Sequence, residues 1–352
     1  SMALLTLPDI RIAGLSAAVP RQRENNADYA WIPKKERESL IKVIGVEERR
    51  VAPKGVTTAD LCVPAAEQLI AALGWDKKEI GLLVFVSQSR DYLVPTTACI
   101  LQDRLGLPHE CAAFDIGLGC SGYVYGLSIV TSMMQSGAIR KALLLVGDIS
   151  TITAAYRDKS THPLFGDVGT VTALEYKPGA TPMTFNLQTD GAGYKALMIQ
   201  DGGARNIFSK KSLEVKKISP GIYRSRLNLE LDGIEVFNFS LREVVPNINT
   251  LLKHTGKTLS DVDYVIFHQA NRLINETLRK MLRLEKEKVP YSIREFGNTS
   301  GASVPLTMIT QLAEPMKNGP LRFLLTAFGV GLSWGSVLVD TDHVVCPGLI
   351  EL

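Results

Sequence analysis

Three residues of this sequence have side chains and neighbours suited to acyl-transfer chemistry, and the first is Cys120. It ends the loop Gly117-Leu118-Gly119-Cys120, between an extended apolar run and a helical stretch rich in small residues. Because helix N-termini favour negative charge, we expect the thiol to lose its proton more readily there and to act as a nucleophile. Its own backbone N–H could also hold an oxyanion. The alternative is a small buried cysteine that only packs at a helix start.

The second and third residues are His268 and Asn298. His268 ends the apolar run 262–268, and Asn298 lies in the loop 297–301, with the sequence GNTSG. Ligands of α/β proteins collect at the carboxyl ends of strands, so polar residues directly after a buried strand indicate a cleft. Histidine and asparagine also cap helices, which is the alternative for both residues.

A glycine-rich segment, Phe328-Gly329-Val330-Gly331, ends the last long strand that we expect in the second half of the chain. Its backbone N–H groups could complete an oxyanion hole, and a simple glycine-rich turn is the alternative. The remaining cysteines and histidines show no metal-ligand spacing, so we expect no metal site. They are Cys62, Cys99, Cys111, Cys346, His109, His162, His254 and His343.

The elements that must position these residues follow the same pattern twice. Short apolar runs read as buried strands, and they alternate with helical stretches, which predicts βαβ pairing in each half. In the first half we expect strands at 81–89, 112–116, 141–147 and 169–175, with helices at 97–105 and 121–135. In the second half we expect strands at 262–268, 321–327 and 335–340, a short extended run ending at 296–299, and helices at 272–284 and 302–314.

Equivalent landmarks of the two halves are separated by nearly constant distances along the chain. Val86 to Phe267 is 181 positions, Gly119 to Gly297 is 178, and Lys141 to Leu321 is 180. We therefore divide the chain into an N-terminal half (10–180), a connection and cap (181–230) and a C-terminal half (231–352). Two similar halves would bring equivalent loops face to face, so that Cys120 meets His268 and Asn298.

Composition narrows the function classes. The chain has 352 residues, 45% of them hydrophobic, and a formal net charge of +3, which argues against a nucleic-acid partner. Five cysteines without a CxxC motif fit a reducing compartment. We see neither a secretory signal nor an apolar run long enough to span a bilayer, so we expect a cytoplasmic protein without a membrane partner.

Other functions remain open on these patterns. Gly117-x-Gly119-x-x-Gly122 matches a dinucleotide fingerprint, but it falls in mid-domain, whereas that motif opens the first βαβ unit. The order Cys, His, Asn is also that of papain-like proteases, but their sequence around the cysteine is absent. A non-catalytic partner subunit of the same fold is a third possibility, although the nucleophile is present.

Taken together, the motifs of this sequence resemble those of the β-ketoacyl-acyl carrier protein synthase III family of the thiolase superfamily. The resemblance extends from Ile10 to Asp340 and is most specific in HQAN (268–271) and GNTSGASVP (297–305). It implies an α/β thiolase-like fold, in which two duplicated βαβ-type halves form a five-layer α-β-α-β-α arrangement. Thiolases use a second cysteine and elongating ketosynthases a second histidine, so Asn298 indicates the initiating type.

The resemblance also implies roles for the residues. Cys120 would accept an acyl group from a donor thioester, with the backbone N–H groups of Cys120 and Val330 holding the oxyanion. His268 and Asn298 would stabilise the enolate formed when malonyl-acyl carrier protein loses carbon dioxide, with Phe328 beside the thiol. The carbanion would attack acyl-Cys120 to give 3-oxoacyl-acyl carrier protein, in a homodimer that needs no metal or redox cofactor. Transfer of the acyl group to oxygen or nitrogen stays open.

The chain departs from the family where the donor binds. The family's coenzyme A-binding tryptophan and arginine correspond to Ser39 and Val43, and a further arginine corresponds to Lys159. Because lysine does not stack as arginine does, we expect a different acyl-CoA or an acyl-carrier donor. Val94 replaces an aromatic residue that lines the partner's acyl pocket in the family, which predicts a starter larger than acetyl.

The helix after HQAN is rich in basic residues, and carrier proteins are acidic. We therefore predict a carrier-protein docking patch, with a solvated basic helix face as the alternative. We expect three of its arginines to share roughly one face. The predicted patch comprises Arg272, Arg279, Lys280 and Arg283, of which the arginines share that face.

Overall fold

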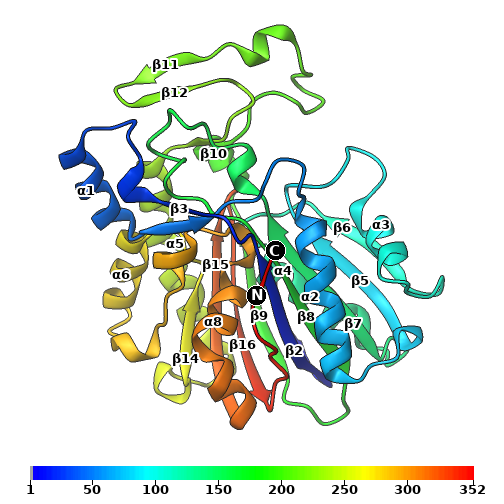
Figure 1. Ribbon diagram of the computed structural model, residues 1–352. Coiled ribbons are helices and arrows are strands. Elements are labelled where there is room, and N and C mark those ends of the chain that lie inside the picture. The colour runs from blue at the N-terminus through cyan, green and yellow to red at the C-terminus, as the bar shows by residue number, and fades with distance from the viewer. Residues whose placement is uncertain (1–2) are drawn as a thin grey trace.

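Two β-sheets with helices on both faces build the protein, and the computed structural model describes residues 3–352 (Figure 1). The first sheet has the strand order β17-β2-β8-β7-β5-β6, and the second has the order β1-β9-β16-β15-β14. Apart from the edge strands, β2-β8-β7-β5 corresponds to β9-β16-β15-β14. The two halves are therefore copies of one unit, as the repeated sequence pattern predicted.

The first sheet forms because its central strands are apolar runs buried on both faces, whereas its edge strands are only partly buried. β5, β6 and β7 run parallel and are linked by α3 and α4, whereas β8 pairs antiparallel with β7 and β2. Its strands are β2 (Ile10–Val19), β5 (Ile80–Val86), β6 (Ala112–Ile116), β7 (Lys141–Asp148), β8 (Val168–Tyr176) and β17 (Ile350–Glu351). Its helices are α2 (Thr58–Leu73), α3 (Thr97–Arg104) and α4 (Gly122–Met134).

The second sheet has the same plan. β14 and β15 are parallel, and β15, β16, β9 and β1 pair antiparallel in turn. Its strands are β1 (Leu4–Leu7), β9 (Met183–Thr189), β14 (Tyr264–Phe267), β15 (Pro320–Gly329) and β16 (Ser333–Asp342). Its helices are α5 (Gly233–Thr255), α6 (Arg272–Met281), α7 (Ile293–Phe296) and α8 (Ser303–Asn318).

The helices complete five layers. α4 and α8 lie between the sheets and contact strands of both, α2 covers the outer face of the first sheet, and α5 covers the outer face of the second (Figure 1). The central layer is apolar: Leu127, Val304 and Met308 are fully buried there among the inner faces of the strands. Burial of this core positions the N-terminal ends of α4 and α8, which follow the loops that contain Cys120 and Asn298.

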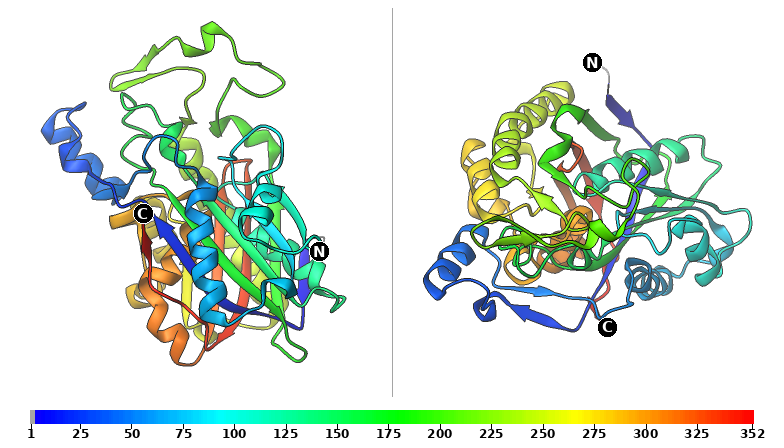
Figure 2. Two further views of the ribbon diagram at one scale, coloured as in Figure 1. Left: turned by 45° about the vertical axis from the view of Figure 1, so that its right-hand side comes forward. Right: turned by 90° about the horizontal axis from the view of Figure 1, so that it is seen from above.

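A cap lies over one end of the sheets. It contains the pairs β10 (Leu197–Met198) with β13 (Glu230–Leu231) and β11 (Lys216–Ser219) with β12 (Ile222–Arg224). α1 (Lys34–Ile44) and the pair β3 (Arg23–Asn25) with β4 (Glu48–Arg50) lie outside the layers. Figures 1 and 2 show the β11–β12 hairpin projecting beyond the sheets.

Two expectations about the chain's course were wrong. β9 lies inside the segment 181–230 that we expected to be connection and cap, because its buried residues pair with β16 in the second sheet. The extended run expected before Asn298 is instead α7, followed by one isolated bridge between Phe165 and Asn298. The second sheet therefore ends at β14, without the further edge strand that β6 adds beside β5 in the first sheet.

Candidate active site

Cys120 lies between β6 and α4, with Ser121 at the N-cap of that helix, as the sequence predicted. Only 7% of the residue is exposed. Burial raises the pKa of the Cys120 thiol to about 11, and the nearby backbone N–H groups of Val330 and Cys120 offset this only in part. The pKa of the thiol is thus raised, whereas we expected it to be lowered, because desolvation outweighs the hydrogen bonds from these two backbone N–H groups.

The C-terminal end of β15 packs directly on this thiol. A Cβ placed on Gly329 would fall 2.5 Å from the Cβ of Cys120 and 2.8 Å from its Sγ, so only glycine fits there. Phe328 is buried beside it, with its ring edge-on to the imidazole of His268 and the ring centroids 5.6 Å apart. The structure thus brings the predicted oxyanion segment, Phe328 to Val330, against the predicted nucleophile.

His268 follows β14 and is almost completely buried. Its backbone N–H donates to the Thr326 carbonyl at 2.8 Å, which continues the β14–β15 pairing and fixes the residue's position. Its Nδ1 lies 2.7 Å from the Oγ of Ser303, at the start of α8. Burial lowers the pKa of His268 to about 3, and the Ser300 backbone offsets this only in part, so the imidazole is neutral at physiological pH.

Asn298 is held by both its backbone and its side chain. Its backbone N–H donates to the Leu164 carbonyl at 2.8 Å, and its carbonyl accepts from the Gly166 N–H at 3.1 Å. Its Nδ2 donates to the Ala270 carbonyl at 3.2 Å, and its Oδ1 accepts from the Ser300 N–H at 2.9 Å. One amide N–H of Nδ2 has no partner within residues 3–352, so it is free to donate to a ligand.

All three candidate residues line one cavity of about 40 Å³, together with Phe328 and Gly329. Cys120 also lines a second cavity, a chamber of about 80 Å³. The thiol therefore borders both this chamber and the cavity shared with His268 and Asn298. Sequence reasoning missed several polar groups of this chamber, since nothing in their local patterns indicated that they approach Cys120. They are Gln88, Ser89, Asp148, Ser150 and Ser300.

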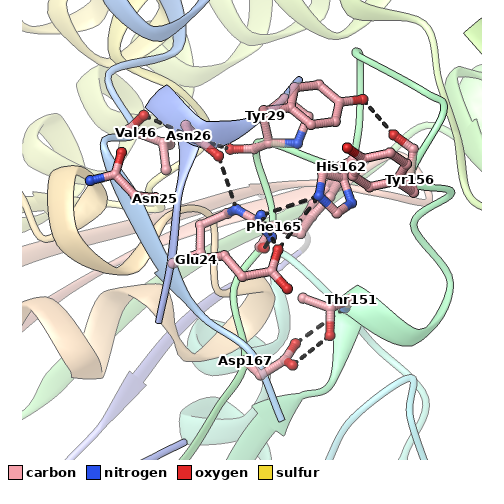
Figure 3. A network of polar contacts seen from close by, with 12 residues as sticks. Glu24, Asn25, Asn26, Tyr29, Val46, Thr151, Tyr156, His162, Phe165 and Asp167 are labelled. Atoms are coloured by element: carbon pink, nitrogen blue, oxygen red, sulfur yellow. Dashed lines mark hydrogen bonds and ion pairs between the residues drawn. The ribbon is translucent and has the colours of Figure 1, made fainter. Parts of the chain in front are cut away.

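A buried polar network holds the segment whose backbone pairs with Asn298 (Figure 3). Arg49, only 2% exposed, donates to the Phe165 carbonyl at 3.1 Å and to Glu24 at 2.9 Å. Asp167 accepts from the hydroxyl and N–H of Thr151, and Figure 3 shows this pair below the arginine's partners. The Phe165-Gly166-Asp167 motif thus anchors the segment that pairs with Asn298. No signal in the sequence indicated that Arg49 is its buried partner.

The predicted donor residues also come together, away from the thiol. Ser39, Val43 and Lys159 all line a groove of about 750 Å³ between α1 and β12. Within it Lys159 forms an ion pair of 2.5 Å with Glu36. Val94 lies elsewhere: it is 82% exposed and lines neither of the cavities at Cys120.

The predicted docking patch needs a correction at Arg279. This side chain is buried, pairs with Glu276 at 2.6 Å and donates to the Leu284 carbonyl at 2.7 Å. It therefore does not share an exposed face with Arg272, and Arg283 lies beyond the end of α6. Arg272, Lys280 and Arg283 are exposed.

Within residues 3–352, no group of three or more His, Cys, Asp or Glu side chains is arranged to hold a metal ion. In the same range, no helix combines the length and the apolar character needed to cross a membrane.

Comparison with known proteins places this geometry in context. Residues 114–191 match the family model for 3-oxoacyl-[acyl-carrier-protein (ACP)] synthase III, and residues 252–341 match the model for its C-terminal part. The chain is 34% identical over 334 residues to a β-ketoacyl-[acyl-carrier-protein] synthase III of Syntrophomonas wolfei, covering 94% of this chain and 97% of that protein.

Solved structures show the same similarity. A 3-oxoacyl-(acyl-carrier protein) synthase from Burkholderia xenovorans LB400 superimposes with a TM-score of 0.93 at 36% identity and covers 99% of both chains. The priming β-ketosynthase of the R1128 polyketide pathway superimposes with a TM-score of 0.83 at 26% identity, covering 97% of this chain and 98% of the other.

Proposed function

This chain belongs to the β-ketoacyl-[acyl-carrier-protein] synthase III family of the thiolase superfamily, and from that premise we propose how its residues divide the reaction. The chain is a condensing enzyme that makes 3-oxoacyl-acyl carrier protein in fatty acid or specialised metabolism. Cys120 carries the acyl group, and His268 and Asn298 serve the decarboxylation. The observation that carries this assignment is the single cavity lined by all three side chains.

In the first half-reaction Cys120 Sγ attacks the carbonyl carbon of a donor thioester. The C–S bond of the donor breaks, and the thiol proton passes in net to the departing thiolate. The backbone N–H groups of Cys120 and Val330, which lie close to Sγ, hold the oxyanion of the tetrahedral intermediate. Because His268 is neutral and weakly basic, it contributes little as a proton acceptor in this step. The step depends mainly on the approach of the thiol to the donor.

In the second half-reaction malonyl-acyl carrier protein occupies the same cavity. His268 and the free N–H of Asn298 donate to its thioester oxygen, which becomes the enolate oxygen when carbon dioxide leaves. The carbanion then attacks the acyl carbon on Cys120, and the C–S bond to the enzyme breaks. The leaving thiolate of Cys120 takes up a proton and the 3-oxoacyl product departs on its carrier. These steps need neither a metal nor a redox cofactor.

Arg272, Lys280 and Arg283 remain the proposed docking surface for the acidic carrier protein, with Arg279 removed from it. Five free cysteines fit the reducing cytoplasm as the compartment. We further propose a homodimer, in which the exposed Val94 faces the acyl pocket of the neighbouring protomer.

For the donor, we propose an acyl group larger than acetyl. We propose that it is delivered without the contacts that the family's tryptophan and arginines make with coenzyme A. The support is the groove lined by Ser39, Val43 and Lys159. Lys159 is the only one of these three side chains that carries a charge, and it already forms an ion pair with Glu36. The test is a donor series from acetyl to octanoyl, each offered on coenzyme A and on carrier protein, with acylation of Cys120 followed by mass. Faster acylation by longer chains on carrier protein is expected, and preferential acetylation from acetyl-CoA would refute the proposal.

The reaction itself is tested by incubating the acylated enzyme with malonyl-acyl carrier protein. The expected result is a 3-oxoacyl-acyl carrier protein whose mass contains the starter, with loss of one carbon dioxide. A product in which the acyl group has moved unchanged to an alcohol or amine would show acyl transfer to a heteroatom instead.

A further inference from the structure

The hydroxyl of Ser303 stands between two groups of the HQAN segment. Ser303 is the first residue of α8 and is completely buried. Its Oγ lies 2.7 Å from Nδ1 of His268 and 3.0 Å from the backbone nitrogen of Gln269. These two contacts are the only hydrogen bonds of Ser303 Oγ within residues 3–352.

The direction of both hydrogen bonds follows from counting donors and acceptors. A backbone N–H can only donate, so Gln269 uses a lone pair of the serine oxygen. The hydroxyl proton of a buried serine also needs an acceptor, because an unpaired buried donor loses its hydrogen bond to water without replacement. The remaining neighbour of Oγ is Nδ1 of His268, so the serine donates and Nδ1 accepts.

This direction decides where the imidazole proton sits. A neutral imidazole carries one proton, and a nitrogen that accepts a hydrogen bond cannot hold it. We propose that Ser303 is a positioning residue that fixes His268 as its Nε2–H tautomer, through its hydroxyl's bond to Nδ1. The burial of the ring, which keeps it neutral, makes the choice of tautomer matter.

The consequence lies on the other side of the ring. Within residues 3–352 the one side-chain hydrogen bond of the imidazole is that of Nδ1 with Ser303, the Ser300 backbone also approaches the ring, and His268 lines the cavity that it shares with Cys120 and Asn298. With the proton on Nε2, His268 and the free amide N–H of Asn298 are two donors for one enolate oxygen. With the proton on Nδ1, a lone pair would face that oxygen and donation from the ring would be lost. This inference rests on the proposed role of His268 in decarboxylation.

The experiment reads the tautomer directly. Protein labelled with ¹⁵N-histidine gives side-chain nitrogen shifts that distinguish Nε2–H from Nδ1–H, and the signals of His268 among the five histidines are assigned with His268→Gln. Wild type should show Nε2–H. Ser303→Ala should show Nδ1–H or a mixture, and Ser303→Thr, which keeps a hydroxyl donor, should restore Nε2–H.

Kinetics of the same variants provide the second readout. Ser303→Ala should lower kcat for condensation by about 10- to 100-fold, less than direct removal of a donor to the oxyanion. It should leave acylation of Cys120 within about two-fold of wild type, and Ser303→Thr should recover most of the loss. Ser292→Ala is the control: it removes another buried hydroxyl, which pairs with Thr307 and does not touch His268. It should change neither the tautomer of His268 nor the ratio of the condensation rate to the acylation rate.

A wild-type His268 with its proton on Nδ1, or a Ser303→Ala protein that keeps the Nε2–H tautomer, would overturn the proposal. Failure of the proposed function looks different. In that case His268→Gln would leave condensation unchanged, whatever tautomer the spectra show.

Discussion

The backbone of Gly329 lies against the side chain of Cys120 more closely than any other residue type would allow. A Cβ at position 329 would come within 2.5 Å of the cysteine Cβ, closer than such atoms approach in proteins. The two residues come from opposite halves of the chain, Cys120 from the loop between β6 and α4 and Gly329 from the end of β15. Their contact is where the duplicated halves meet at the nucleophile.

Substituting Gly329 by alanine should therefore displace either the thiol or the segment that carries the Val330 N–H. We expect Gly329→Ala to slow acylation of Cys120 by about 100-fold or more, the scale of losing one oxyanion donor. Gly117→Ala is the matched control, because a Cβ at Gly117 in the nucleophile loop meets nothing within 4 Å. The measurement is the initial rate of acyl-enzyme formation. Equal rates for the two variants would show that the contact does not constrain the thiol.

The pKa of Cys120 predicts how its reactivity depends on pH. Burial raises this pKa to about 11, so the thiolate fraction grows about ten-fold for each pH unit from 7 to 10. Alkylation of Cys120 by iodoacetamide, followed by peptide mass spectrometry, should rise with the same slope and show no plateau near neutral pH. A plateau between pH 6 and 8 would mean that the helix N-terminus and the Val330 N–H outweigh burial.

His268 and Asn298 should matter for the second half-reaction far more than for the first. Each of His268→Ala and Asn298→Ala removes a donor to the enolate oxygen and should lower malonyl decarboxylation by about 100- to 1000-fold. Acylation of Cys120 should stay within about ten-fold in both. Because the two donors serve one oxygen, the double variant should lose less than the product of the single losses. A variant that loses acylation and decarboxylation equally would contradict this division of roles.

The basic residues of α6 should separate into two classes. Reversing the exposed pair, as in Arg272→Glu with Lys280→Glu, should raise the KM for carrier protein by about ten-fold and leave self-acylation intact, since electrostatic docking is lost. Arg279→Met should instead lower the free energy of unfolding by about 1–3 kcal/mol, because Glu276 and the Leu284 carbonyl lose their partner. Equal KM effects from both changes would return Arg279 to the docking surface.

Local pattern and repetition predicted most of the fold. β6, a partly buried edge strand, has the bounds expected for 112–116. β14, β15 and β16 lie where apolar runs predicted them, because a strand that is buried on both faces is a continuous apolar run in the sequence. β9 was missed because its polar residues, such as Asn186, pair within the second sheet and with α5. Their partners are distant in the sequence.

For the candidate site too, local pattern and repetition predicted the positions of the residues, but not what surrounds them. Cys120 and His268 were predicted because each follows a buried apolar run, and the duplication placed the loop of Asn298 opposite theirs. What failed depends on the surroundings of a side chain rather than on its position. The helix start suggested an acidic thiol, but burial from the second half decides the pKa of Cys120. Likewise, the helical spacing of Arg279 could not show that its side chain bonds to Glu276 and to the Leu284 carbonyl in the segment after α6.

Intact-protein mass spectrometry of wild type and Cys120→Ala, each mixed with the acyl-thioester donor series, tests the central claim most directly. The account predicts that wild type gains the mass of one acyl group, that the modified peptide contains Cys120, and that malonyl-acyl carrier protein then discharges it as a 3-oxoacyl product. Cys120→Ala should gain no mass. Equal acylation of both proteins, or an acyl group on wild type that malonyl-acyl carrier protein does not discharge, would contradict the account.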